Sequence, residues 1–337
     1  MKVEEQYSLK NHNTFGIDVR CDRFISVEHP DEVPVLMKQG VFLSPFFILG
    51  GGSNVLFTKD FDGTIVHPVF TGIEKIDESD NSVWVRVAAG EEWEDLQQYC
   101  LQHQLYGLEN LVGIPGNVGS APVQNIGAYG TEVKDCIEFV EGWRLDTGAP
   151  FRFTNEQCRF GYRDSIFKNE MRHKCFITHV TFRLSKIEHY NLKYKALADA
   201  MEKSGLPLSL KNVTDCIRQV RDSKLPDLTQ IGCAGSFFKN PVIPQSNFNQ
   251  LLLEFPDLVS YPAPNGQVKL AAGQLIEKAG WKGKRVGNAG VYDKQALVLV
   301  NYGGASAQEV LSVCEAVIRD VYEKFHVTIS PEVNIIG

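Results

Sequence analysis

The sequence contains no apolar run close to the ~20 residues that a membrane-spanning helix requires. Its longest apolar stretches, residues 45–49 and 296–300, are far shorter. Residues 1–15 also lack the apolar core of a signal peptide. We therefore expect a cytoplasmic protein without a membrane segment.

An excess of basic residues is also missing, because 34 Lys and Arg stand against 41 Asp and Glu, for a formal net charge of −7. Such a balance does not favour nucleic acid as a partner, although a local basic pocket stays open. The eight cysteines form no C-x-x-C pair and the eight histidines no H-x-x-x-H pair. We expect no metal site, and cysteines that act as small buried side chains.

The composition that remains is that of an ordinary globular protein, with 43% apolar and 22% charged residues. A length of 337 residues predicts two or three domains, at roughly 100–200 residues each. Shifts in pattern place the boundaries near residues 70 and 225. We expect parts at 1–70, 71–224 and 225–326, with the tail 327–337 returning to the first part.

Local patterns predict a mixture of strands and helices. Alternation favours a strand at residues 83–87, and acidic residues open a helix near Glu91. Ser306 and Glu309 form a capping box that begins a long amphipathic helix. Further strands are expected at 137–145, 175–184 (with Phe176, Val180, Phe182 and Leu184 on one face) and 296–302, further helices at 195–203, 213–224 and 270–278, and an extended tail at 327–336.

Two glycine-rich segments, 50–54 and 113–130, are the first features that suggest chemistry. Glycine permits positive φ and lets backbone N–H groups converge on an anion. Either segment alone is equally typical of a tight turn. Neither has the spacing of a P-loop or of a G-x-G-x-x-G fingerprint. Two of them in one half favour a long, phosphate-bearing ligand such as a dinucleotide, bound outside a Rossmann fold.

Three single residues have both an ordinary and a functional reading. Arg163, beside Tyr162, is either a surface charge or part of an anion site. Ser236 follows Gly235 and is either a turn or cap residue or a functional hydroxyl. Glu332, after a proline, is unremarkable alone. The residues by themselves support an α/β enzyme with a nucleotide-like ligand and leave its reaction open.

Taken in order, the segments resemble a known family. They are Asn13–Gly16, LGGGSNVL at 49–56, GIPGNVGSAPVQNIGAYG at 113–130, GYRDSIFK at 161–168, KLPD at 224–227, GSFFKNP at 235–241 and SPEV at 330–333. This series, from about residue 11 to the C-terminus, resembles the UDP-N-acetylenolpyruvoylglucosamine reductases of bacterial peptidoglycan synthesis. Residues 191–195 look like the substrate-covering loop of the family's first type.

The resemblance implies an α+β fold: an FAD-binding domain of the vanillyl-alcohol-oxidase type in two parts, then an α/β substrate-binding domain. It assigns catalysis to Ser236, Arg163 and Glu332. It assigns FAD binding to Gly50, Gly51, Gly52, Ser53, Asn54, Pro115, Gly116, Ser120, Gln124, Asn125, Gly127, Ala128 and Tyr129. It assigns UDP-sugar binding to Tyr194, Arg221, Lys224, Asn240 and Gln295.

The implied reaction has two halves at one site. NADPH reduces non-covalently bound FAD, and hydride then passes from flavin N5 to C3 of the enolpyruvyl group. Arg163 and Glu332 polarise that group, which requires a proton on Glu332, and Ser236 gives a proton to C2. A monomer with a small-molecule substrate suits this activity.

Two rival readings are an oxygen-using flavin oxidase of the same fold and a non-catalytic nucleotide-binding module. An oxidase needs no serine proton donor, and a module need not keep Ser236, Arg163 and Glu332 together. The sequence departs from the family's usual pattern at Cys233, Leu228 and Gln274. None of the three supplies a reacting group, so the departures affect loop fit and substrate affinity rather than the reaction.

Overall fold

The computed structural model describes residues 1–337, which divide into two compact units. Unit 1 consists of Met1–Tyr7, Cys21–Gly51 and Asp62–Arg221, and unit 2 of Ser8–Arg20, Gly52–Phe61 and Asp222–Gly337. The boundary between Arg221 and Asp222 lies close to the one expected near residue 225. Two short N-terminal segments, Ser8–Arg20 and Gly52–Phe61, join unit 2, so that unit 1 resumes at Asp62. The three-part functional division therefore stays a proposal.

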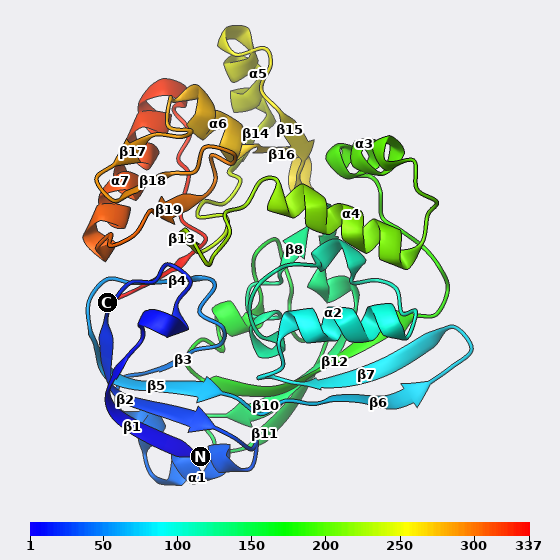
Figure 1. The fold of residues 1–337 in the computed structure, drawn as a ribbon, viewed down its shortest axis with the longest axis vertical. Helices are drawn as coiled ribbons and strands as arrows, with labels where there is room; N and C mark the ends of the chain where they lie inside the picture. The colour runs from blue at the N-terminus through cyan, green and yellow to red at the C-terminus, as the bar shows by residue number, and fades with distance from the viewer. The chain divides into compact units, whose positions relative to one another are not determined.

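Unit 1 begins with a four-stranded sheet in the order β1-β2-β5-β3 (Figure 1). Its buried apolar residues, Ile25, Val27 and Val66, pack against Val33 and Leu36 of helix α1. The elements are β1 (Lys2–Ser8), β2 (Arg20–Val27), α1 (Glu32–Lys38), β3 (Phe46–Ile48) and β5 (Phe61–Pro68).

The second sheet of unit 1 is antiparallel and five-stranded, in the order β11-β10-β12-β7-β6. Helix α2 covers one face, where Trp93 and Leu96 pack with Val85 and Phe182. The predicted alternation at 83–87 and the helix near Glu91 are confirmed. The elements are β6 (Ile73–Glu78), β7 (Ser82–Ala88), α2 (Trp93–Gln102), β10 (Ile137–Arg144), β11 (Pro150–Thr154) and β12 (Cys175–Ser185).

One prediction for β12 is wrong. Val180, Phe182 and Leu184 share the core with α2, but Phe176 packs in the cluster around α1. The register between β10 and β12 shifts at this point, since Glu141 pairs with His179 and Gly142 with Ile177. The extra residue, Thr178, is a β-bulge that reverses which side chains face each side of the sheet.

Helices α3 (Lys195–Ser204) and α4 (Leu210–Asp222) complete unit 1. Leu197 and Met201 of α3 pack with Val213 and Ile217 of α4. Both helices match the predicted ranges within three residues at either end. A small hairpin at the end of the second glycine-rich segment is formed by β8 (Gly127–Ala128) and β9 (Thr131–Glu132).

Unit 2 combines small sheets with three helices. Strand β20 pairs in parallel with β4, so the extended C-terminal tail returns to an N-terminal strand. Helix α7 packs on β18 and β19 in Figure 1. The elements are β4 (Val55–Phe57), β13 (Gly232–Cys233), β14 (Val242–Pro244), α5 (Gln245–Glu254), β15 (Ser260–Pro262), β16 (Gln267–Leu270), α6 (Ala272–Lys278), β17 (Arg285–Val286), β18 (Ala289–Val291), β19 (Leu299–Asn301), α7 (Ala307–Phe325) and β20 (Asn334–Ile336).

The capping box of α7 is confirmed: the Glu309 backbone N–H donates to Ser306 Oγ at 3.2 Å, and Ser306 N–H donates to Glu309 Oε2 at 2.8 Å. The strand expected at 296–302 is shorter, because Val298 N–H bonds back to the Gln295 carbonyl in a turn before β19. All eight cysteines are buried and free, as expected for small apolar side chains. No helix is long and apolar enough to cross a membrane.

Candidate functional site

The two glycine-rich segments meet within unit 1. A Cβ added at Gly51 would lie 2.8 Å from the Gly116 Cα, too close for any side chain. Asn117 and Ser120 lie against the neighbouring Gly50. This approach exposes backbone rather than side chains to a ligand, which fits an extended diphosphate such as that of FAD. Gly52, Ser53 and Asn54 continue the first segment in unit 2.

Helix α2 anchors the second glycine-rich segment. The Trp93 backbone N–H donates to the Gly116 carbonyl at 2.9 Å, and its indole N–H donates to the Leu111 carbonyl at 2.9 Å. Val118 N–H bonds the Glu91 carbonyl at 2.9 Å. The loop therefore keeps its conformation through a buried tryptophan and the start of a helix.

Most of the predicted cofactor residues in this loop are accessible. Pro115 and Ser120 are exposed, and Gly116, Gln124, Gly127, Ala128 and Tyr129 are half-buried. Tyr129 (φ 49°) and Gly130 (φ 80°) form the tight turn between β8 and β9. Asn125 differs, because it is 0% exposed. Its side chain is therefore closed to a ligand, which the sequence did not indicate.

Arg163 lies against the same loop. Its Nη2 donates to the Gly127 carbonyl at 2.6 Å and its Nη1 to the Asn125 carbonyl at 3.4 Å. Arg163 has a φ of 52°, which is uncommon for a residue with a long side chain. The neighbouring Ser165 Oγ donates to the Val123 carbonyl at 2.5 Å. Segments 161–165 and 123–127 are thus tied at several points.

The segments that carry Ser236 and Glu332 pair through their backbones in unit 2. The Glu332 N–H donates to the Phe237 carbonyl at 2.7 Å, and Lys239 N–H donates to the Ser330 carbonyl at 3.0 Å. Ser236, exposed on the Gly235 bend (φ 66°), therefore stands beside the SPEV segment. Its side chain makes no hydrogen bond, so it caps no turn. Phe237 and Phe238 are 0% and 1% exposed and belong to the core of unit 2.

Two of the predicted substrate residues lie in unit 1. The Tyr194 ring meets the Tyr129 ring edge to face, with centroids 5.3 Å apart. Arg221 Nη2 donates to the Gly113 carbonyl at 3.1 Å, at the start of the second glycine-rich segment. Tyr194 and Arg221 therefore both contact the loop that is predicted to hold the flavin.

The other three substrate residues lie in unit 2. Asn240 Oδ1 accepts from Ala272 N–H at 3.0 Å, at the beginning of α6. Gln295 Oε1 would stand 3.2 Å from a Cβ on Gly273, the next residue of α6. Asn240 and Gln295 are thus brought to the same helix end. Lys224 is half-buried just after α4.

Sequence reasoning missed Asn110, which is 0% exposed. Its Nδ2 donates to the carbonyls of Tyr129 at 3.1 Å and Asn191 at 2.9 Å. It therefore ties the Tyr194 segment to the predicted flavin loop. The available signal was a pair of polar residues, Glu109 and Asn110, enclosed by Leu108 and Leu111.

The departure Cys233 lies in β13, where its carbonyl accepts from Thr14 Oγ1 at 2.6 Å. Burial raises the pKa of its thiol. Gln274 bonds Val259 N–H at 2.7 Å and the Asp257 carbonyl at 2.9 Å. Both residues have structural contacts, and Leu228 is exposed.

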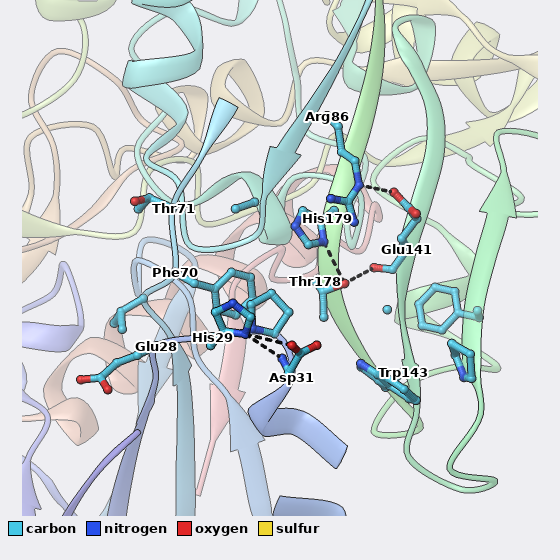
Figure 2. Close-up of a pocket in the computed structure, with 16 residues that line it drawn as sticks. Glu28, His29, Asp31, Phe70, Thr71, Arg86, Glu141, Trp143, Thr178 and His179 are labelled. Carbon is cyan, nitrogen blue, oxygen red and sulfur yellow. Dashed lines mark hydrogen bonds and ion pairs between the residues drawn. The ribbon is translucent and has the colours of Figure 1, made fainter. Parts of the chain in front are cut away.

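A cavity of about 770 Å³ lies in unit 1, and its lining, drawn in Figure 2, contains none of the predicted site residues. Arg86 Nε is paired with Glu141 Oε2 at 2.9 Å. Burial, with Arg86 nearby, lowers the pKa of His179 to about 4, so its ring is neutral at pH 7. Glu28 and Asp31 are acidic residues of the same lining. Such a lining does not suit a diphosphate, which needs cations.

The sequence matches the profiles of two domains. The FAD binding domain matches residues 22–149, and the C-terminal domain of UDP-N-acetylenolpyruvoylglucosamine reductase matches residues 227–336. The fold is similar to the reductase of that name from Thermus caldophilus, with a TM-score of 0.70, 24% identity and both chains covered completely.

Full-length relatives carry the same name. The chain is 45% identical over 338 residues to the UDP-N-acetylenolpyruvoylglucosamine reductase of Flavobacterium johnsoniae, which covers 100% of both proteins. It is 46% identical over 335 residues to that of Bacteroides fragilis, covering 99% of this chain and 100% of the relative. The chain therefore belongs to the family of UDP-N-acetylenolpyruvoylglucosamine reductases.

Proposed function

We propose that this chain reduces the enolpyruvyl ether of UDP-N-acetylglucosamine to UDP-N-acetylmuramate, a step of peptidoglycan precursor synthesis, with NADPH as reductant and FAD as cofactor. The observation that carries the proposal beyond family membership is the backbone pairing of 237–239 with 330–332. The sequence separates the Ser236 and Glu332 segments widely, and their pairing supports a single site that uses both residues.

FAD suits the residues of unit 1. The glycine backbones at 50–51 and 116 approach each other without side chains between them, and helix α2 fixes the loop that follows. When bound there, FAD would supply the hydride-transfer chemistry between NADPH and the enolpyruvyl group. No cysteine or histidine of the glycine-rich segments offers a covalent tether.

The chain's own residues handle charge and the proton. Arg163 supplies a fixed cation for the negative charge that develops on the substrate as hydride arrives. Glu332, carrying a proton, stabilises the enolate at C2, and Ser236 delivers the proton that quenches it. The exposed Ser236 hydroxyl, unbonded within the protein, remains available to the substrate.

The UDP portion needs cations and hydrogen-bond donors, because the protein as a whole is acidic. Arg221 and Lys224 supply positive charge for the diphosphate. Tyr194 covers the substrate, while Asn240 and Gln295 contact its polar groups. A cytoplasmic location and a monomeric state belong to this proposal.

The test uses the purified flavoprotein under anaerobic conditions. NADPH should bleach the flavin absorbance, and the enolpyruvyl nucleotide should restore it faster than air-saturated buffer does. Faster reoxidation by oxygen, with no response to the nucleotide, would favour the flavin oxidase. A chain that binds nucleotide without any flavin reduction would favour the non-catalytic module.

The binding mode of FAD has a separate test. Acid precipitation should leave all flavin absorbance in the supernatant, because no side chain tethers the ring. Yellow colour retained in the washed protein pellet would contradict non-covalent binding.

A further inference from the structure

We propose that Asn125 is a positioning residue that fixes the direction of the Arg163 guanidinium, rather than a residue whose side chain binds FAD. The proposal rests on the role assigned to Arg163 in the proposed function. It changes the reading of the sequence, which grouped Asn125 with the cofactor residues.

The side-chain amide of Asn125 forms hydrogen bonds within the protein through both its nitrogen and its oxygen. Its Nδ2 donates to the Gly161 carbonyl at 2.8 Å and to Glu132 Oε2 at 3.1 Å, and its Oδ1 accepts from Lys134 N–H at 3.1 Å. An amide has two donor hydrogens, and both are therefore used. With 0% of the residue exposed, the remaining lone pair is out of reach of a ligand.

Segments 125–127 and 161–163 hold each other through hydrogen bonds in both directions, an arrangement called the clamp below. The Asn125 side chain holds the backbone of Gly161, two residues before Arg163, while the Arg163 guanidinium holds the carbonyls of Asn125 and Gly127. A Cβ on Gly127 would stand 2.9 Å from both Arg163 Nη1 and the Thr131 carbonyl oxygen, so a larger residue there would displace the guanidinium or the backbone. Each segment thus orients the other.

Backbone conformation explains why asparagine occupies this position. Asn125 has a φ of 49° and Arg163 a φ of 52°, so both ends of the clamp lie in the left-handed region. Asparagine tolerates that region far better than most residues. Arginine does not, so its conformation must be held by neighbouring contacts. The hydrogen bond from Asn125 to the Gly161 carbonyl, two residues before Arg163, is one such contact.

The experiment compares Asn125→Gly with Asn155→Gly. Glycine keeps the positive φ without strain and removes the amide. Asn155 is the matched control, since its Nδ2 donates to the carbonyls of Lys134 at 2.7 Å and Ile137 at 2.8 Å but touches neither Gly161 nor Arg163. Both variants are prepared as flavin-loaded full chains, and FAD affinity is measured by flavin fluorescence.

For Asn125→Gly we expect an FAD dissociation constant and a rate of flavin reduction by NADPH within about threefold of the wild type, because the amide does not reach the cofactor. Reoxidation by the enolpyruvyl nucleotide should slow ~10- to 100-fold, the scale of a misplaced reacting group. Asn155→Gly should change neither half-reaction. In an Arg163→Ala background, Asn125→Gly should add little, since coupled residues are non-additive.

Other outcomes overturn the proposal. An FAD affinity reduced more than about tenfold, with both half-reactions slowed, would make Asn125 a cofactor residue after all. Equal slowing of reoxidation in the Asn155 control, or full additivity with Arg163→Ala, would reduce its role to general stability. Should Asn125→Gly fail to fold, Asn125→Asp replaces it. Aspartate has the same side-chain shape and keeps the oxygen that accepts from the Lys134 N–H, but it cannot donate to Gly161. FAD affinity and both half-reactions are then measured as for Asn125→Gly. If Arg163→Ala alone leaves reoxidation unchanged, the proposed function of Arg163 fails instead.

Discussion

Arg163 in unit 1 and Ser236 in unit 2 are held in different ways. The Arg163 guanidinium bonds two backbone carbonyls, and a buried asparagine holds its loop. The Ser236 side chain bonds nothing, and its position depends on backbone bonds of the residues that follow it. A fixed charge needs a rigid setting, whereas a proton donor needs a hydroxyl that the substrate can reach.

The largest effect is expected for Ser236→Ala. Flavin reduction by NADPH should proceed normally, because no contact within the protein is lost. Reoxidation by the enolpyruvyl nucleotide should slow by ~10²–10⁴, the usual value of a positioned acid. That factor corresponds to roughly 3–5 kcal/mol of barrier. Stopped-flow measurement of both half-reactions checks it, and an unchanged second half-reaction would remove Ser236 from the mechanism.

The pairing of the Ser236 segment with the Glu332 segment illustrates what a sequence can and cannot provide. The motifs identified both residues, and the capping box at Ser306 identified α7, because these signals are local. The segment pairing itself joins distant parts of the chain and has no local signal. The bulge at Thr178 and the burial of Asn125 were missed for the same reason, since each depends on a partner strand or loop.

A smaller effect is expected for Tyr194→Phe, which keeps the ring contact with Tyr129 and removes only the hydroxyl. A hydrogen bond to a charged diphosphate contributes about 1.5–3 kcal/mol. We therefore expect KM for the enolpyruvyl nucleotide to rise ~10- to 100-fold, at 1.4 kcal/mol per factor of ten. Flavin reduction by NADPH should change far less.

Tyr190→Phe is the matched control for Tyr194→Phe. Tyr190 lies in the same segment, but its hydroxyl already donates to Glu188 Oε1 at 2.7 Å. Its loss should leave KM unaltered. Equal KM values for both variants and the wild type would mean that the Tyr194 hydroxyl does not meet the substrate.

Gly51→Ala tests the close approach of the two glycine-rich segments in unit 1, the unit that holds Arg163 in place. The added methyl would meet the Gly116 Cα at 2.8 Å, so the two glycine-rich segments must separate. Overpacking of this kind costs about 1–3 kcal/mol. We expect a lower melting temperature and loss of FAD on gel filtration. Full flavin occupancy in the variant would show that the close approach is not part of the cofactor site.

The smallest effect is expected for His179→Gln, in the cavity of Figure 2. Burial and Arg86 lower the pKa of His179 to about 4 from an ordinary 6.5. Between these values the unfolded chain binds a proton that the folded chain excludes. The free energy of unfolding should therefore fall as the pH drops from 6.5 to 4, with no further change from this group below pH 4.

Glutamine keeps a polar side chain of similar size but cannot titrate. His179→Gln should flatten the decline in stability between pH 6.5 and 4, as measured by urea unfolding at several pH values. Both half-reactions should keep their wild-type rates at pH 7, because the cavity contains none of the residues assigned to the reaction. A slowed half-reaction would connect this cavity to the chemistry. An unflattened stability profile would mean that His179 accepts its proton in the folded state as readily as in the unfolded chain.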